Sequence, residues 1–337
     1  MSVDVAALAD IVAGVLPGDG PVAIEGLARI HGGASRETWR FDAVRGGDRH
    51  GLILRRDPAA SLIDTDRRVE FAAYRSFENT DVPVPRALLL EETPGRLGAP
   101  FFLMERIDNA SAMSPFQPGA YGVHAEAISR QFFHALGRIA ARDVASAPLT
   151  AVLQTSDEPP WRRELAHWAQ VVATDALEPQ PIAQAAIRRL KRTPPPPPQR
   201  LAIVHGDYRS GNFMQDGAGR IMAVLDWEMA HLGDPLEDLA WALDPLWSHG
   251  DPERPLGGVP RAEAIAIWEA ASGLTADPEA LSWWSLFASL KGLAIWISAG
   301  EAYARGANAD PVNGFSSWFC TAFHNDLIAR RLAGAAA

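Results

Sequence analysis

The densest cluster of polar side chains that could do chemistry lies between residues 205 and 228. Residues 205–212 have the sequence HGDYRSGN, and residues 225–228, which begin thirteen residues after Asn212, have the sequence LDWE. Each segment follows a short apolar run that predicts a strand. We therefore expect Asp207, Asn212 and Asp226 to lie together at one edge of these strands. Carboxylate and amide oxygens suit Mg²⁺, which binds few protein oxygens and keeps positions for substrate phosphates. A carboxylate beside such a metal can also accept the proton of an attacking hydroxyl, and together these groups suit phosphoryl transfer.

The elements that must position this cluster differ between the two parts of the chain. In the first part, alternating apolar residues and glycine pairs predict an antiparallel sheet, with a helix over 66–79 between its strands. Its predicted strands lie around residues 24–27, 38–41, 52–55, 87–90 and 101–104. After residue 120 the pattern becomes helical, and it is interrupted by five prolines that predict an extended connector. These later segments are 121–146, 161–175 and 181–192 before the prolines at 194–198, strands at 201–204 and 221–225, and helices to the end.

Composition narrows the classes of protein that the chain can belong to. It has 337 residues, 47% of them hydrophobic, and a formal net charge of −10 at pH 7, which disfavours nucleic acid as a partner. The one cysteine, Cys320, excludes an internal disulfide framework and is typical of a reducing compartment, so we expect a cytoplasmic protein. Acidic residues near the start predict an amphipathic first helix in place of a signal peptide. The apolar stretch 281–300 has Lys291 at its centre, which predicts a buried helix and no membrane span.

The central motifs resemble the aminoglycoside phosphotransferase family. HGDYRSGN, DWE where protein kinases have DFG, and GDPLEDLAW follow one another in that order. The chain also resembles the kinase-like domains attached to some acyl-CoA dehydrogenases. The resemblance implies an α+β, protein-kinase-like two-lobe fold, with an antiparallel-sheet N-lobe over 1–105 and a mainly helical C-lobe over 106–337. It implies ATP as the nucleotide, with GTP not excluded, and Mg²⁺.

The family pattern also assigns roles to single residues of these motifs. It makes Asp207 the catalytic base and makes Asn212 and Asp226 the Mg²⁺ ligands. Three further residues would support the catalytic loop, namely His205, Arg209 and Glu228. Any one of these side chains alone can be explained by a capped turn or a surface acid, and for a single aspartate that explanation is the better one. Their joint spacing favours the functional interpretation.

The resemblance places the nucleotide against the N-terminal sheet. Gly33 and Ser35 lie in a glycine-containing loop between two strands, where backbone N–H groups can bind phosphate. Arg55 stands where kinases have a lysine and is expected to pair with Glu70. Arg56 is a rival for this position, but alternation puts Ile53 and Arg55 on one face of the strand. In the expected hinge strand, Met104 would flank the adenine, and the backbone from Glu105 to Ile107 would offer it hydrogen bonds.

The segment Asp234-Pro235-Leu236-Glu237 has the pattern of a helix capping box. A structural role therefore explains Asp234 and Asp238, and neither belongs to the predicted catalytic set; in the family such acids hold the loop. No Gly-Lys pair occurs in the sequence, which excludes a P-loop.

Three functions remain open. The principal one is transfer of the γ-phosphoryl group of ATP to a hydroxyl of a small molecule, with a hydroxyacyl-CoA or another lipophilic alcohol as acceptor. The second is an aminoglycoside or macrolide antibiotic phosphotransferase, and the third is a catalytically silent kinase-like module that binds a nucleotide or metabolite. Five tryptophans after residue 260 would suit an apolar acceptor, although core packing explains most of them equally well. No membrane partner is expected, and the oligomeric state is open.

Overall fold

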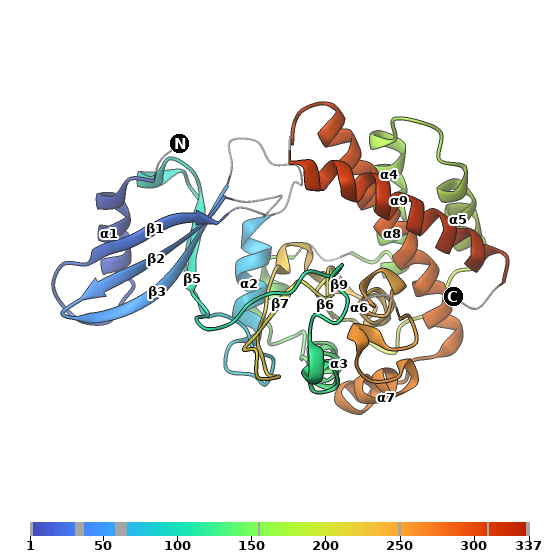
Figure 1. Ribbon diagram of the computed structural model, residues 1–337, viewed down its shortest axis with the longest axis horizontal. Coiled ribbons are helices and arrows are strands. Elements are labelled where there is room, and N and C mark those ends of the chain that lie inside the picture. The colour runs from blue at the N-terminus through green and yellow to red at the C-terminus, as the bar shows by residue number, and fades with distance from the viewer. Residues whose placement is uncertain are drawn as a thin grey trace.

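The protein has a two-lobe α+β fold (Figure 1). The computed structural model describes residues 3–30, 37–57, 66–153, 156–248, 251–308 and 310–334. In this part of the chain the N-terminal lobe holds a five-stranded sheet with the order β1-β2-β3-β5-β4, and each neighbouring pair is antiparallel. Its strands are β1 (Ala23–Ile30), β2 (Glu37–Arg45), β3 (Asp48–Arg56), β4 (Ala87–Glu91) and β5 (Phe101–Glu105).

Two helices cover opposite faces of this sheet. Helix α1 (Val5–Ala13) packs Leu8 and Val12 against Phe41, Leu54 and Leu103. Helix α2 (Arg67–Phe77) lies on the other face, whose buried residues belong to the same core as the C-terminal lobe. Because side chains alternate along a strand, Leu54 faces α1 while its neighbours Ile53 and Arg55 face α2. This alternation is what directs Arg55 toward the centre of the molecule.

The C-terminal lobe consists mainly of helices. Burial of its apolar and aromatic side chains supplies most of the driving force for packing this lobe. Trp284, Phe287 and Leu290 of α8 are fully buried there. The helices are α3 (Ala125–Ala141), α4 (Pro160–Asp175), α5 (Pro181–Arg192), α6 (Leu236–Ala242), α7 (Arg261–Ser272), α8 (Pro278–Ala304) and α9 (Pro311–Leu332). Of these, α4, α5, α6 and α9 pack against α8, while α3 and α7 pack against each other.

Helix α8 confirms the prediction of a buried helix. It is long and apolar enough to cross a bilayer by length and composition, but 78% of its most apolar window is buried inside the molecule. Lys291, at its centre, is 1% exposed. The helix therefore packs as the core of the C-terminal lobe.

Two small antiparallel ribbons between the lobes carry the polar cluster. Strand β6 (Ala202–Val204) pairs with β9 (His231–Gly233), and β7 (Phe213–Gln215) pairs with β8 (Ile221–Val224). The two strands that the sequence predicts, β6 and β8, thus do not pair with each other. The cluster is brought together instead by a hydrogen bond of 2.8 Å from the Leu225 N–H to the Asn212 carbonyl, which joins the end of β8 to the start of β7.

Candidate active site

Three hydrogen-bond donors converge on the carboxylate of Asp207. The Asn212 amide donates to Oδ2 at 2.6 Å, and the Trp241 indole donates to Oδ1 at 2.9 Å. The Arg209 Nε lies 3.0 and 3.2 Å from the two oxygens. The structure therefore brings together the predicted residues Asp207, Asn212 and Arg209. Trp241, on α6, is a contact that the sequence did not predict.

His205 joins the catalytic loop to the segment that follows β8. Its Nδ1 accepts the Asp207 N–H at 3.1 Å, and its Nε2 lies 2.9 Å from the Leu225 carbonyl. The second contact requires a proton on Nε2, so both ring positions are satisfied by a neutral imidazole. Burial lowers the pKa of His205, which agrees with the neutral form. His205 is thus a structural member of the loop, as the resemblance implies.

A buried acid and a buried lysine hold the backbone before Asp207. The Asp238 carboxylate accepts the N–H groups of His205 at 2.6 Å and Gly206 at 3.0 Å, and its burial raises the pKa of Asp238. Lys291 donates from Nζ to the Gly206 carbonyl at 2.5 Å. Gly206 has a φ of +87°, and a Cβ there would lie 2.4 Å from the Met229 carbonyl oxygen. Only glycine fits this position without a shift of the backbone.

Asp226 lies beside Arg55 in a backbone conformation that is rare for an aspartate. Its φ of 67° and ψ of 54° are left-handed, and its N–H donates to the hydroxyl of the buried Tyr74 at 3.1 Å. The side chain is 36% exposed, and its Oδ1 lies 3.3 Å from the Arg55 guanidinium. The amide nitrogen of Asn212 contacts Asp207, so the amide oxygen of Asn212 can bind another partner. This oxygen and the Asp226 carboxylate are the kind of ligand that Mg²⁺ prefers.

Arg55 makes the ion pair that strand alternation predicts. Its Nη1 lies 2.5 Å from Glu70, whose side chain is fully buried on α2. Burial opposes the charged form, but Glu70 and Asp226 outweigh it and raise the pKa of Arg55. Glu228 is half-buried and adds its negative charge nearby. Arg56, the rival, instead pairs with Glu37 at 2.5 Å on the other face of β3.

The backbone of the expected hinge strand already makes two hydrogen bonds within the protein. Met104 is buried on the face of the sheet that is turned toward α2. The Glu105 N–H donates to the Arg86 carbonyl, and the Arg106 N–H donates to the Gly51 carbonyl, each at 2.9 Å. Neither N–H is therefore available to an adenine ring. Among the described residues, Ile107 has the one N–H of this segment without a hydrogen bond.

Two predicted phosphate-binding residues lie outside the described residues. These are Gly33 and Ser35, in the loop that joins β1 to β2. Their role stays a prediction.

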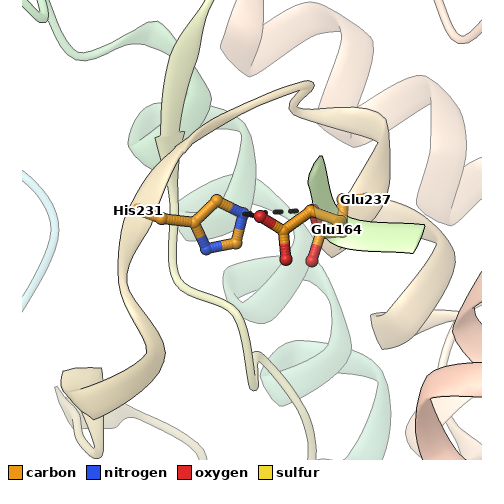
Figure 2. Close-up of side chains that lie close together, drawn as sticks. All are labelled: Glu164, His231 and Glu237. Carbon is orange, nitrogen blue, oxygen red and sulfur yellow. Dashed lines mark hydrogen bonds and ion pairs between the residues drawn. The ribbon is translucent and has the colours of Figure 1, made fainter. Parts of the chain in front are cut away.

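A second polar cluster lies next to the catalytic loop (Figure 2). The imidazole of His231 lies 3.1 Å from Glu237 and 3.7 Å from Glu164. Lys291 lies 3.0 Å from the other oxygen of Glu237, and Arg163 lies 3.2 Å from Glu164. Burial opposes protonation of His231, but the two carboxylates outweigh it and raise its pKa to about 9. The three side chains have ligand atoms within 4.8 Å of one another, yet their negative charge is already met by these cations, so the cluster is a buried ion network.

The capping-box prediction before α6 is wrong in one respect. Asp234 accepts the Leu236 N–H at 3.0 Å, as a cap does, and also accepts the Trp284 indole N–H at 2.9 Å. Glu237 faces Lys291 and His231 rather than the start of the helix. Two buried cations outcompete a backbone N–H for this carboxylate, because ion pairs gain strength where water is excluded.

Comparison with known proteins assigns the family and the fold. The model of the phosphotransferase enzyme family matches residues 26–274. The chain is 30% identical over 230 residues to mouse acyl-CoA dehydrogenase family member 10, which covers 65% of this chain and 21% of that protein. It therefore spans about a fifth of the length of this relative.

Solved structures show the same architecture. A Ralstonia eutropha protein named as a candidate aminoglycoside phosphotransferase has a TM-score of 0.80 at 20% identity and covers all of both chains. A thermostable mutant of aminoglycoside phosphotransferase APH(4)-Ia, in a ternary complex with ADP and hygromycin B, has a TM-score of 0.62 at 18% identity and covers 94% of this chain and 96% of its own. The predicted protein-kinase-like two-lobe fold is confirmed. With a family model that matches most of its length, the chain belongs to the phosphotransferase enzyme family.

Proposed function

We propose that the protein transfers the γ-phosphoryl group of ATP to a hydroxyl of a small molecule. The observation that carries this proposal is the convergence of Asn212, Arg209 and Trp241 on the Asp207 carboxylate. The hydrogen bond from Leu225 to Asn212 joins this group to the segment that carries Asp226, which contacts Arg55. Phosphoryl transfer depends mainly on positioning and on neutralisation of charge, and this arrangement provides both.

Asp207 acts as the catalytic base. Its carboxylate accepts the proton of the acceptor hydroxyl while the new O–P bond forms and the bond from the γ-phosphorus to the β-phosphate bridging oxygen breaks, which releases ADP. Trp241 and Arg209 fix the direction of the carboxylate, so little reorganisation is needed when the acceptor binds. Asn212 and Asp226 would hold Mg²⁺, which supplies positive charge to the phosphate oxygens.

In this proposal Arg55 holds the nucleotide phosphates. Its guanidinium is anchored by the buried Glu70 and is 11% exposed, so it has few alternative positions. A guanidinium can bind a phosphate through two parallel hydrogen bonds, which allows it to serve where kinases have lysine.

The acceptor that we propose is a hydroxyacyl-CoA or another lipophilic alcohol. Support comes from the 30% identity to a part of an acyl-CoA dehydrogenase family member. The antibiotic phosphotransferase and the silent binding module are the alternatives. A silent module has no need for Asp207, Asn212 and Asp226 in one cluster, which disfavours it.

Turnover of ATP in the presence of Mg²⁺ and a panel of alcohols tests the proposal. The panel contains hydroxyacyl-CoA, kanamycin-type compounds, a macrolide, choline and homoserine, and phosphorus NMR identifies the product. We expect Asp207→Asn to lower kcat by about 10²- to 10⁴-fold, because the base is lost while the shape is kept. Asp157→Asn, at an exposed aspartate, is the matched control. Equal turnover by the wild type and Asp207→Asn would exclude a catalytic base at this position.

A further inference from the structure

A row of aromatic side chains leads from the catalytic loop to the surface of α9. The Arg209 guanidinium lies 4.9 Å from the centre of the Trp247 ring. From there the ring centroids follow one another at 6.4 Å, 6.3 Å, 5.7 Å and 6.3 Å. We call these five side chains the aromatic row, in the order Trp247, Phe116, Phe319, Phe315 and Trp318.

The inner end of the aromatic row is fixed against the reaction centre. Arg209 contacts both Trp247 and the Asp207 carboxylate. A side chain at Gly211, in the catalytic loop, would lie 3.4 Å from the ring of Pro115, so the residues before Phe116 lie against the same loop. An acceptor whose hydroxyl reaches Asp207 therefore has the first rings of the row beside it.

Exposure increases along the aromatic row. Trp247 is 2% exposed, Phe116 and Phe319 are each 41% exposed, Phe315 is 54% exposed and Trp318 is 72% exposed. Single exposed apolar residues are common, but a continuous row of large rings on a protein surface marks a binding site. Four of the five tryptophans after residue 260 are half-buried or buried, which leaves Trp318 as the one that faces solvent.

The charge around the aromatic row indicates what it binds. Residues 311–325, which include the three rings on α9, contain no Asp, Glu, Lys or Arg. A polycationic antibiotic would find no carboxylate on this part of the helix, whereas an alkyl or acyl chain would lose only water. Arg209 and Asp207 lie at the inner end, where the polar part of the acceptor must be, and Asp310 caps the first turn of α9.

We propose that the aromatic row is the binding site for the apolar chain of the phosphoryl acceptor, whose hydroxyl then lies at Asp207. This inference rests on the proposed function and adds to it the residues that select the acceptor. It makes chain length, rather than positive charge, the property by which the protein chooses among alcohols.

A series of straight-chain hydroxycarboxylic acids, four to ten carbons long and otherwise identical, tests the row. Isothermal titration with the Asp207→Asn variant and Mg²⁺·AMP-PNP measures binding without turnover, and ADP release by the wild type measures kcat/KM. We expect affinity and kcat/KM to rise about twofold or more with each added methylene, since burying one methylene in full is worth about fourfold.

Variants at the outer end of the aromatic row should remove this dependence. In Trp318→Ser and Phe315→Ser, which change exposed residues, the rise per methylene is expected to fall to less than half of the wild-type value. Leu201→Ser removes a side chain that is 49% exposed before β6 and is the matched control, with the wild-type dependence retained.

The outcomes separate this inference from the proposed function. If the acids are phosphorylated at rates independent of chain length, or if the two row variants keep the wild-type dependence, the inference is wrong and the phosphotransferase proposal stands. If no acid is phosphorylated but binding tightens with chain length only when the row is intact, the row is an apolar binding site and the proposed function is wrong. A dimer that dissociates in Trp318→Ser, with no change in chain-length dependence, would identify the row as an interface between copies and overturn the inference.

Discussion

Arg55 carries more than one role at the scale of single residues. It neutralises the fully buried Glu70 and also lies 3.3 Å from Asp226, so one guanidinium joins β3, α2 and the segment after β8. A lysine has one ammonium and cannot reach both carboxylates with parallel donors. Arginine in this position thus fixes the segment that carries Asp226 relative to β3 and α2.

Removal of Arg55 should affect stability and nucleotide binding separately. Arg55→Met leaves the charge of Glu70 buried and is expected to lower the free energy of unfolding by about 3–5 kcal/mol. The double variant Arg55→Met/Glu70→Leu removes both charges and should recover most of this loss. Both variants should bind ATP about 10- to 100-fold more weakly, because charge-assisted hydrogen bonds to phosphate are lost.

Chemical denaturation and equilibrium nucleotide binding measure the two effects. Arg56→Met is the matched control on the same strand, and its nucleotide affinity should stay within about twofold of the wild type, since Arg56 faces Glu37. Unchanged ATP affinity in the double variant would show that Arg55 does not contact the nucleotide.

Sequence patterns predicted some of these contacts and missed others for a physical reason. Alternation along β3 was enough to choose Arg55 over Arg56, because it depends only on neighbouring residues. The indole of Trp241 reaches Asp207 from a helix 34 residues later in the chain, and no local pattern reports such a contact. The backbone from Glu105 to Ile107 was expected to offer hydrogen bonds to an adenine, but the chain on either side of the end of β5 accepts the N–H groups of Glu105 and Arg106.

At the scale of elements, α8 contacts the catalytic loop through Lys291. Lys291 lies between the Trp168 and Trp241 rings, 5.6 Å from each centroid, and contacts the Gly206 carbonyl and Glu237. The carboxylate of Asp238, on α6, accepts hydrogen bonds from the N–H groups of His205 and Gly206 in the same stretch of backbone. The loop that carries Asp207 is thus fixed by two helices, each through a buried charge.

Loss of the lysine on α8 should slow catalysis without a large change in nucleotide binding. Lys291→Met roughly keeps the length of the side chain but removes its charge. We expect the unfolding free energy to fall by about 3 kcal/mol. This value is at the lower end of the usual range, because Glu237 still has His231 as an ion-pair partner. We also expect kcat to fall while KM for ATP changes little, since Gly206 directly precedes Asp207. Lys191→Met, at the other lysine, which is exposed, should leave both quantities unchanged. A normal kcat in a stably folded Lys291→Met protein would contradict this role.

The long elements were predictable, whereas two of the short strands between the helices were not. Helices α4 and α5 extend over several turns, so their apolar periodicity is clear from the sequence. Helix α8 is apolar on all sides, and it was predicted from the length of its apolar stretch and from Lys291 at the centre. Strands β7 and β9 have three residues each, too few for a period of two to show, and they form because their partners β8 and β6 lie beside them. The boundary between lobes at residues 105 and 106 stays a prediction.

At the scale of the whole molecule, the ion network couples stability to pH. His231 on β9 lies between Glu164 on α4 and Glu237 on α6, and its pKa is raised to about 9. Protonated His231 stabilises the folded state, and this contribution is fully present at pH values below about 6.5, the pKa of histidine in the unfolded chain. The contribution is lost as the pH rises through about 9, the pKa in the folded state. We expect the unfolding free energy to fall by about 3 kcal/mol between pH 6 and pH 10 from this group.

Urea unfolding at a series of pH values measures the effect. His231→Gln should show a smaller fall over this range, whereas His134→Gln, at an exposed histidine on α3, should keep the wild-type curve. The same slope in wild type and His231→Gln would mean that other groups control stability in alkaline solution.

Chelation distinguishes the two polar clusters. Excess EDTA should abolish turnover, because the phosphoryl transfer that we propose would need Mg²⁺ at Asn212 and Asp226, but it should leave the Tm of the nucleotide-free protein unchanged. The charges of Glu164 and Glu237 are met by Arg163, His231 and Lys291 and need no metal. A drop in Tm on adding EDTA would identify a resident metal and contradict the description of this cluster as an ion network.

The scarcity of lysine has a practical consequence for chemical labelling. Of the 31 basic residues, the sequence has lysine at positions 191 and 291 alone. Lys291 is buried and Lys191 is exposed at the end of α5. Of the two lysines, an amine-reactive dye or surface linker would therefore attach to Lys191 in the folded protein, which allows immobilisation and fluorescence experiments without modification of Lys291 beneath the loop that carries Asp207.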